Sequence, residues 1–174
     1  VLMRLREICC DPRLVADDWT GSSAKLEACL ELVTEAVAGG HRILLFSQFT
    51  SMLELLAKRL DEAGVSHFTL QGSTPKPVRA EQVRRFNQGE ADVFLISLRA
   101  GGTGLNLTAA DIVIHYDPWW NLAAQNQATD RAYRIGQRNP VQVYRLIAQD
   151  TIEEKIVELQ QAKQSLADTV TGGA

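Results

Sequence analysis

The stretch ILLFSQFTSMLELLAKRLDEAGVSHFTL, residues 43–70, decides the fold class. It opens with an apolar run that suits a strand buried on both faces of a parallel sheet. Ser51 and Glu54 then form a capping-box pair, which predicts a helix that ends at Gly64. A second apolar segment, residues 65–70, follows that glycine. A strand, a helix and a strand in this order predict a right-handed crossover between two parallel strands.

The same alternation continues on both sides of this unit. Ser22 and Ser23 can cap a helix that Gly39 closes. The apolar spacing predicts further helices over residues 78–88, 121–133 and from Thr151 onward, and further strands over residues 93–97, 112–116 and 141–147. In the last helix, the apolar residues expected to face inward are Ile152, Ile156 and Leu159. The predicted fold class is therefore α/β, a three-layer sandwich around a parallel sheet of about five strands.

Length and composition limit the functions to consider. At 174 residues the chain fits one domain, and its 45% hydrophobic and 22% charged residues are typical of a soluble globular protein. No apolar run could span a bilayer and no signal peptide is recognisable, so we expect no membrane partner and a cytoplasmic location. Cys9, Cys10 and Cys29 lack metal-ligand spacing, so no metal site is expected.

The N-terminus indicates a piece of a longer protein. Val1 is not an initiator methionine, and Leu2, Leu5 and Ile8 already have the spacing of a helical apolar stripe. At the other end, only residues 171–174 look like a frayed tail.

The net charge is −3, from 18 basic and 21 acidic residues, which at first sight argues against a nucleic-acid partner. The basic residues are nevertheless clustered along the chain. One cluster holds Arg79, Arg84 and Arg85, and another holds Arg131, Arg134, Arg138 and Arg145. A locally basic face on a mildly acidic domain is therefore compatible with the composition.

Four segments follow predicted strands and should emerge at one edge of the sheet, where parallel sheets bind ligands. They are rich in groups that bind phosphate or stack on rings: Ser47 to Thr50, Gln71 to Thr74, Arg99 to Gly104 and Asp117 to Asn121. This coincidence is the first indication of a functional site.

Two of these segments are glycine-containing turns. The loop from Arg99 to Asn106 can aim backbone N–H groups at an anion, but it is not a P-loop because no Gly-Lys-Ser/Thr follows. Gln71 to Pro75 can be an ordinary turn or, with Arg79 behind it, a cradle for a nucleic-acid phosphate. Taken singly, each is explained as well or better by a plain turn.

Trp119 and Trp120 are adjacent and cannot both point to one face of the chain. One should pack in the core and the other should be exposed. An exposed tryptophan at a ligand-binding edge could stack on a base or wedge into a groove, although burial is the commoner use of the ring.

The sharpest signal is QATDRAYRIGQ, residues 127–137. Arg131 and Arg134 have the spacing of one helical face, one turn after Gln127. Two neighbouring guanidinium groups repel unless an anion lies between them, and a polyphosphate suits both. The plainer alternative is a pair of surface arginines balanced by Asp130 and neighbouring acids.

The run resembles motif VI of the Swi/Snf-type ATPases of helicase superfamily two. Blocks similar to other motifs of that family follow in order over almost the whole chain: the linker at residues 2–14, motif IV at 43–49, the next block at 71–86, motif V and its sequel at 93–121, and a bracing helix at 151–166. Leu122 and Gln71 depart from the family's usual proline and aspartate. The double tryptophan favours the bacterial or archaeal branch.

The resemblance implies the second RecA-like lobe of a two-lobe motor, without a P-loop of its own. Residues 1–21 would be a linker, 22–150 the lobe, and 151–174 the bracing helix and tail. ATP and Mg²⁺ would be held mainly by a first lobe outside this sequence, so the chain alone should not hydrolyse ATP. The implied partners are double-stranded DNA, that first lobe and DNA-bound proteins such as RNA polymerase, in the nucleoid of a prokaryote or the nucleus of a eukaryote.

The resemblance also implies roles for individual residues. Arg131 and Arg134 would be catalytic arginine fingers, and Gly104, Asn106 and Gln127 would face the nucleotide. The residues that match the DNA-tracking surface are Gln48, Gly72, Ser73, Thr74, Arg79, Arg99, Gly101, Gly102, Thr103 and Trp120. Their contacts would go mainly to backbone phosphates, with little sequence preference.

Two other classes stay open at this point. A self-contained Rossmann-like enzyme, such as a nucleotide-sugar transferase, would use the same edge and bind a small nucleotide unaided. A protein-interaction module would use the acidic helices and tolerate loss of both Arg131 and Arg134. Neither class explains the order and identity of the motifs.

Overall fold

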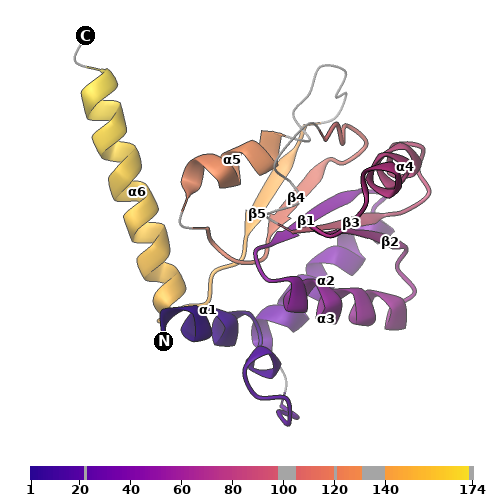
Figure 1. The fold of residues 1–174 in the computed structure, drawn as a ribbon, viewed down its shortest axis with the longest axis horizontal. Helices are drawn as coiled ribbons and strands as arrows, with labels where there is room; N and C mark the ends of the chain where they lie inside the picture. Colours follow the sequence, from indigo (N-terminus) through magenta and orange to yellow (C-terminus); the bar gives the residue numbers. More distant parts are fainter. Residues whose placement is uncertain (22, 98–104, 120, 131–139, 173–174) are drawn as a thin grey trace.

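The computed structural model describes residues 1–21, 23–97, 105–119, 121–130 and 140–172. Within these ranges the chain forms a five-stranded sheet between layers of helices (Figure 1). The strands are β1 (Ile43–Ser47), β2 (His67–Leu70), β3 (Val93–Ser97), β4 (Ile112–His115) and β5 (Gln142–Arg145). Their order is β2-β3-β1-β4-β5 and every neighbouring pair is parallel, which confirms the predicted α/β fold.

Helices cover both faces of this sheet. One layer holds α2 (Ala24–Ala38) and α3 (Thr50–Glu62), and the other holds α4 (Lys76–Asn87) and α5 (Leu122–Asp130) (Figure 1). The N-terminal α1 (Leu2–Cys10), a short 3-10 helix (Pro12–Leu14) and the long α6 (Ile152–Thr171) complete the described elements.

Alternation along the central strand divides the core in two. Ile43 and Leu45 of β1 pack with α2 and α3, whereas Leu44 and Phe46 pack with α4 and α5. Successive strand residues point to opposite faces, so an unbroken apolar run is what a strand covered on both sides requires. All five residues of β1 are buried, as are those of β3.

Most of the predicted helix ends agree with the structure. The Ser23 hydroxyl caps α2 by accepting the N–H of Leu26 at 3.3 Å, and Thr151 caps α6. Gly64 and Gly89 follow α3 and α4 with φ of 70° and 93°, a conformation that favours glycine.

The predicted capping box of Ser51 and Glu54 is wrong. Helix α3 begins at Thr50, Phe49 stands at the N-cap position, and no side chain caps that end. The N–H of Phe49 instead donates to the Ser47 hydroxyl at 3.2 Å, so the hydroxyl at the strand end orders this turn. Ser51 therefore lies inside the first turn rather than before it.

Other boundaries shift by one or two residues. Helix α4 starts at Lys76 rather than at residue 78, because prolines suit the first turn of a helix. Strand β2 starts at His67, and β5 covers residues 142–145 only. The helix predicted over 121–133 is seen as Leu122–Asp130, and its remainder lies outside the described residues.

Two helices bury different residues from those expected. On α6 the buried positions are Glu153, Ile156 and Gln160, while Leu159 is 49% exposed. The inward face follows the spacing i, i+3, i+7, which places a glutamine inside and the leucine outside. On α1 the apolar stripe of Leu2, Leu5 and Ile8 is likewise exposed, and the buried residues are Arg6 and Cys10.

A buried ion pair joins the start of α6 to α2. Lys25 Nζ lies 2.6 Å from Glu153 Oε1, and both side chains are almost fully buried. The same carboxylate accepts the N–H of Ala148 at 2.7 Å, and the ammonium lies 5.0 Å from the centre of the Tyr116 ring. This pair fixes where α6 leaves the lobe. No helix of the described ranges is both long enough and apolar enough to cross a membrane.

Candidate nucleic-acid interface

The carboxyl ends of β1, β2 and β3 surround a hollow of about 540 Å³. Its lining consists of Gln48, Thr50, Gln71, Gly72, Ser73 and Ser97. Three residues predicted to contact DNA, namely Gln48, Gly72 and Ser73, are therefore brought together, although they come from two different strand ends. Gly72 and Ser73 are exposed, so their backbone and hydroxyl groups are accessible from solvent.

Asp117 holds Gln48 at this hollow. The Ser47 hydroxyl donates to one carboxylate oxygen of Asp117 at 2.5 Å, and the backbone N–H of Gln48 donates to the other at 3.3 Å. The Gln48 side-chain amide donates to the Pro118 carbonyl at 3.2 Å. The end of β1 is thus bonded at three points to the segment after β4.

The Asp117 carboxyl is completely enclosed at this junction. Burial raises its pKa, while the hydrogen bonds from Ser47 and Gln48 and the charge of Lys25 act in the opposite direction. Because a buried carboxylate is retained only where it is bonded and balanced, Asp117 is a structural cross-link between two strand ends.

The turn after β2 is closed by its own hydrogen bonds. The Thr74 N–H donates to the Gln71 carbonyl, and the Gln71 N–H donates to the Thr74 hydroxyl, both at 3.0 Å. Thr74, predicted to contact DNA, thus orders the turn that presents Gly72 and Ser73. Arg79, one turn into α4, is partly buried and does not line the hollow.

The two described residues predicted to face a nucleotide are both exposed. Asn106 follows the glycine-rich loop, and its carbonyl accepts the side-chain amide of Asn87 at 2.7 Å. Gln127 lies on the outer face of α5, whose inner face carries Gln125 and Ala128. Among the described residues neither of them is buried, so both side chains are accessible there.

One tryptophan of the pair packs, as predicted. Trp119 is buried, and its ring meets Phe46 edge-on at 6.1 Å and His115 at 5.6 Å. Several predicted site residues lie outside the described residues: Arg99, Gly101, Gly102, Thr103, Gly104, Trp120, Arg131 and Arg134. Their roles stay predictions.

Two arginines of the first cluster are paired with acidic side chains. Arg84 pairs with Glu81 and Arg85 with Glu90, each at 2.5 Å. These exposed pairs offset the charges of Arg84 and Arg85, whereas Lys76 and Arg79 of α4 take no part in them. The lining of the hollow itself holds hydrogen-bond donors for a phosphate and no cation of α4.

Sequence reasoning missed the residues that support the site. Asp117 was expected only as part of a polar segment, and Asn87, Gln125 and Gln160 were not singled out. Each acts through a contact with a distant part of the chain, such as Asn87 with the loop at residue 106. Within the described ranges, no group of three or more His, Cys, Asp or Glu side chains is placed to hold a metal ion.

The buried His115 makes the stability of the fold depend on pH. Burial lowers its pKa to about 3, and the charge of Arg145 acts in the same direction. Between about pH 6.5 and pH 3 the unfolded chain binds one proton more at this residue than the folded chain, so stability falls as the pH falls. We expect His115→Gln to reduce the slope of unfolding free energy against pH by up to ~1.4 kcal/mol per unit in this window. Urea unfolding at a series of pH values measures this slope, and parallel profiles for both proteins would contradict the expectation.

A parallel sheet with helices on both faces, polar loops at its carboxyl edge and no P-loop is the architecture that the resemblance to a RecA-like helicase lobe implies. The chain belongs to the helicase conserved C-terminal domain family, whose model matches residues 24–136.

Relatives in this family come from bacteria and eukaryotes. The chain is 44% identical to the putative ATP-dependent helicase/translocase YwqA of Bacillus subtilis, over 98% of this chain and 19% of that protein. It is 47% identical to the chromatin-remodeling ATPase INO80 of Aspergillus niger, over 93% of this chain and 9% of the relative. A mouse SWI/SNF-related regulator of chromatin, subfamily A member 1, is 39% identical over 98% of this chain and 18% of its own length. These relatives confirm the resemblance to Swi/Snf-type ATPases, while the similar identities leave the bacterial or archaeal branch a prediction.

A solved structure supports the same assignment. The C-terminal part of the Fun30 ATPase domain superposes with a TM-score of 0.76 at 33% identity, over 90% of this chain and 53% of that one. The chain thus spans less than a fifth of the full-length relatives described above and about half of the solved fragment.

Proposed function

We propose that this chain is the second motor lobe of a DNA-dependent ATPase that translocates on double-stranded DNA and remodels protein–DNA complexes. The observation that carries the proposal is the gathering of Gln48, Gly72 and Ser73 around one hollow at the ligand edge of a helicase-family lobe. The names of the relatives, which include an ATP-dependent helicase/translocase and a chromatin-remodeling ATPase, support it.

The DNA contact is proposed to be made with backbone phosphates. The hollow presents exposed backbone at Gly72, a hydroxyl at Ser73 and the side chain of Gln48, which the Asp117 cross-link keeps in place. Such groups bond phosphate oxygens without reading the base sequence. Thr74, Arg79 and the residues of the glycine-rich loop would extend this track, and Trp120 would stack or wedge beside it.

The nucleotide contact is proposed to be shared with a first lobe, which would hold ATP and Mg²⁺ for the most part. Gly104, Asn106 and Gln127 would face the nucleotide from this side. The nucleotide supplies the phosphoanhydride bond whose hydrolysis drives the motor. Arg131 and Arg134 would stabilise the charge that spreads over the phosphoryl oxygens during transfer. DNA-bound proteins such as RNA polymerase would be displaced, in the nucleoid or in the nucleus.

Duplex binding by the chain itself tests the DNA contact. We expect weak binding of a fluorescein-labelled duplex of random sequence, with a dissociation constant of about 10⁻⁴–10⁻⁶ M that weakens steeply with added salt. Ser73→Asp should weaken it roughly tenfold at low salt, because it places a negative charge against phosphate. Fluorescence anisotropy over a salt series measures both effects.

Ser165→Asp is the matched control, since it adds the same charge on the exposed far half of α6. It should leave the affinity close to that of the unmodified chain. Salt-insensitive binding, or equal losses from both aspartates, would remove the proposed phosphate contact at the hollow.

A further inference from the structure

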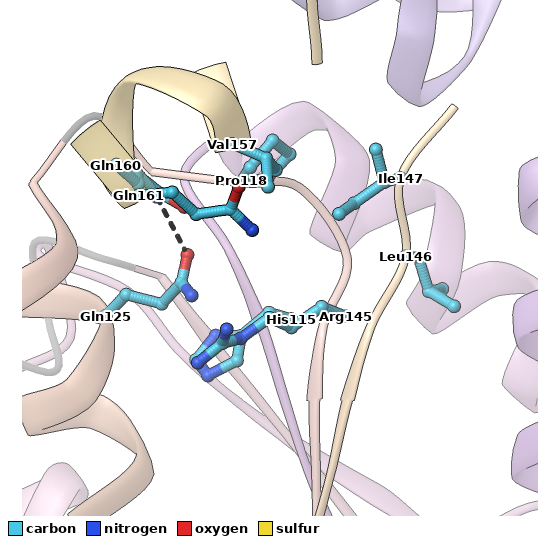
Figure 2. Close-up of a pocket in the computed structure, with 9 residues that line it drawn as sticks. All are labelled: His115, Pro118, Gln125, Arg145, Leu146, Ile147, Val157, Gln160 and Gln161. Carbon is cyan, nitrogen blue, oxygen red and sulfur yellow. Dashed lines mark hydrogen bonds between the residues drawn. The ribbon is translucent and has the colours of Figure 1, made fainter. Parts of the chain in front are cut away.

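A second cavity, of about 230 Å³, lies between the ends of β4 and β5 and the first half of α6 (Figure 2). It shares no lining residue with the hollow at the ends of β1, β2 and β3. Its lining consists of His115, Pro118, Gln125, Arg145, Leu146, Ile147, Val157, Gln160 and Gln161. None of the roles proposed for DNA or nucleotide uses these residues, so this cavity calls for a separate explanation.

The sheet register places two basic side chains next to each other in this cavity. His115 of β4 and Arg145 of β5 are directly paired Cα positions of neighbouring parallel strands, so their side chains leave the same face of the sheet. Figure 2 shows the imidazole and the guanidinium together at the base of the cavity. Arg145 makes no ion pair with an acidic side chain of the described residues, and none of the lining residues is acidic.

Two buried polar atoms at the cavity have no hydrogen-bond partner among the described residues: Gln125 Nε2 and His115 Nδ1. Both side chains are only 1% exposed. The other end of the Gln125 amide is fully used, because its Oε1 accepts the Trp119 N–H at 3.3 Å and the Gln160 amide at 3.4 Å. These two bonds fix the orientation of the Gln125 side-chain amide. Its NH₂ group is then the end that can donate to a molecule in the cavity.

The imidazole orientation is fixed in a similar way. His115 Nε2 lies 2.9 Å from the Thr129 hydroxyl, which itself donates to the Gln125 carbonyl at 3.3 Å. Because the Thr129 hydroxyl gives its only proton to the Gln125 carbonyl, it must accept the bond from His115. The imidazole proton therefore lies on Nε2, and Nδ1 keeps its lone pair. A buried donor such as the Gln125 NH₂ is costly to leave unbonded, which favours an occupant that accepts its hydrogen bond.

Two of these groups, the Gln125 NH₂ and the Arg145 guanidinium, together select an anion with an apolar body, and His115 Nδ1 can bond that anion only after it takes up a proton. The Gln125 NH₂ and the Arg145 guanidinium are donors suited to a carboxylate, and a guanidinium can bind it in a bidentate manner. Pro118, Leu146 and Val157 supply apolar walls that suit a short aliphatic chain. We propose that the cavity binds a carboxylate group carried on a short aliphatic chain.

Binding would also change the state of His115. A carboxylate beside Arg145 offsets the positive charge that opposes protonation of the imidazole, and it can accept a hydrogen bond from a protonated Nδ1. His115 and Arg145 are the ionisable groups among the lining residues, so their charges dominate the response. An occupied cavity should therefore hold a proton that the empty cavity does not.

Sodium butyrate is the probe, with neutral butyramide as the isosteric control. We expect butyrate to shift the His115 ring nitrogens and the Gln125 side-chain amide in NMR spectra of this chain, saturably and with a dissociation constant of about 1 mM to 10 mM. Butyramide can donate to His115 Nδ1 but lacks the charge that pairs with the Arg145 guanidinium, so it should bind at least tenfold more weakly. The absence of a saturable shift with butyrate would show that the cavity does not bind a short-chain carboxylate, and equal or tighter binding of butyramide would show that it does not select the charge. Either result would overturn the proposal.

Two variants locate the binding. Gln125→Glu keeps the acceptor for Trp119 and Gln160 but replaces the donor by an oxygen, and Arg145→Gln removes the cation. Each should weaken butyrate binding at least tenfold, whereas Arg84→Gln, at an exposed arginine of α4, should not. Unchanged binding in both variants would overturn the assignment, and near-native NMR spectra show that each variant is folded.

The carboxylate could come from a free metabolite or from an acidic side chain of another polypeptide segment. Glutamate blocked at both ends as an amide distinguishes the two. If the blocked glutamate binds as tightly as butyrate, the source of the carboxylate is an acidic side chain. If the cavity binds butyrate but not the blocked glutamate, the source is a small free acid. Neither result depends on the DNA or nucleotide contacts, so this test can fail while the proposed motor function stands.

Discussion

In a protein that combines this chain with the first lobe proposed above, Arg134→Ala should lower ATP turnover by about 10³–10⁵-fold while DNA binding is retained. The reason is the chemistry of phosphoryl transfer, in which positive donors stabilise charge that develops on the transferred group. Removing one such donor affects the transition state far more than the bound ground state. Steady-state ATPase assays with saturating duplex, together with anisotropy for binding, measure the two quantities separately.

Matched variants make this result specific. Arg134→Lys should also fail to restore turnover, because an ammonium cannot reproduce the planar fork of a guanidinium. Arg84→Ala, which breaks only an exposed pair with Glu81, should leave turnover nearly unchanged. Retained ATPase in Arg134→Ala would remove the finger role and reopen the alternative of a protein-interaction module, which uses the acidic helices and tolerates the loss of these arginines.

The second large effect concerns the buried ion pair between α2 and α6. Lys25→Met should lower the free energy of unfolding by about 3–5 kcal/mol, because it leaves the carboxylate of Glu153 buried without its counter-charge. Glu153 is only 1% exposed, and its remaining bond from Ala148 cannot compensate a full charge. Urea unfolding of the chain followed by circular dichroism measures the loss.

Two further variants separate the buried charge from simple loss of contact. Arg59→Met breaks an exposed pair with Glu27 and should cost less than about 1 kcal/mol. The double variant Lys25→Met, Glu153→Gln removes both charges and should recover part of the stability lost in the single variant. A small loss in Lys25→Met, similar to that of Arg59→Met, would contradict the account of this pair.

The sheet could be predicted because its signals are local. Apolar runs such as residues 43–46 and glycines such as Gly64 depend on neighbours in the sequence, and the structure follows them closely. The gathering of Gln48, Gly72 and Ser73 at one hollow was also predictable, since parallel strands bring their carboxyl ends to the same edge.

The supporting residues could not be predicted because they act at long range. Nothing near Asp117 in the sequence shows that its carboxylate will bond Ser47 and Gln48, about seventy positions earlier. The error on α6 has a similar origin, because the choice of Gln160 over Leu159 as the inward residue depends on the buried carbonyl of Trp119 that it bonds. Periodicity alone favours the leucine, whereas an unbonded buried carbonyl favours the glutamine.

The Asp117 junction has a mechanical consequence for a motor that pulls on DNA. A load applied at Gln48 passes along the backbone into β1, and the bonds from Ser47 and Gln48 to Asp117 share it with the segment after β4, at the centre of the sheet. Little of that load is absorbed by bending of a loop, because the turn is bonded on several sides. Under the proposed function, the lobe would therefore move as one stiff body in each ATPase cycle. The bending that accompanies this movement would occur where the lobe joins the rest of the protein.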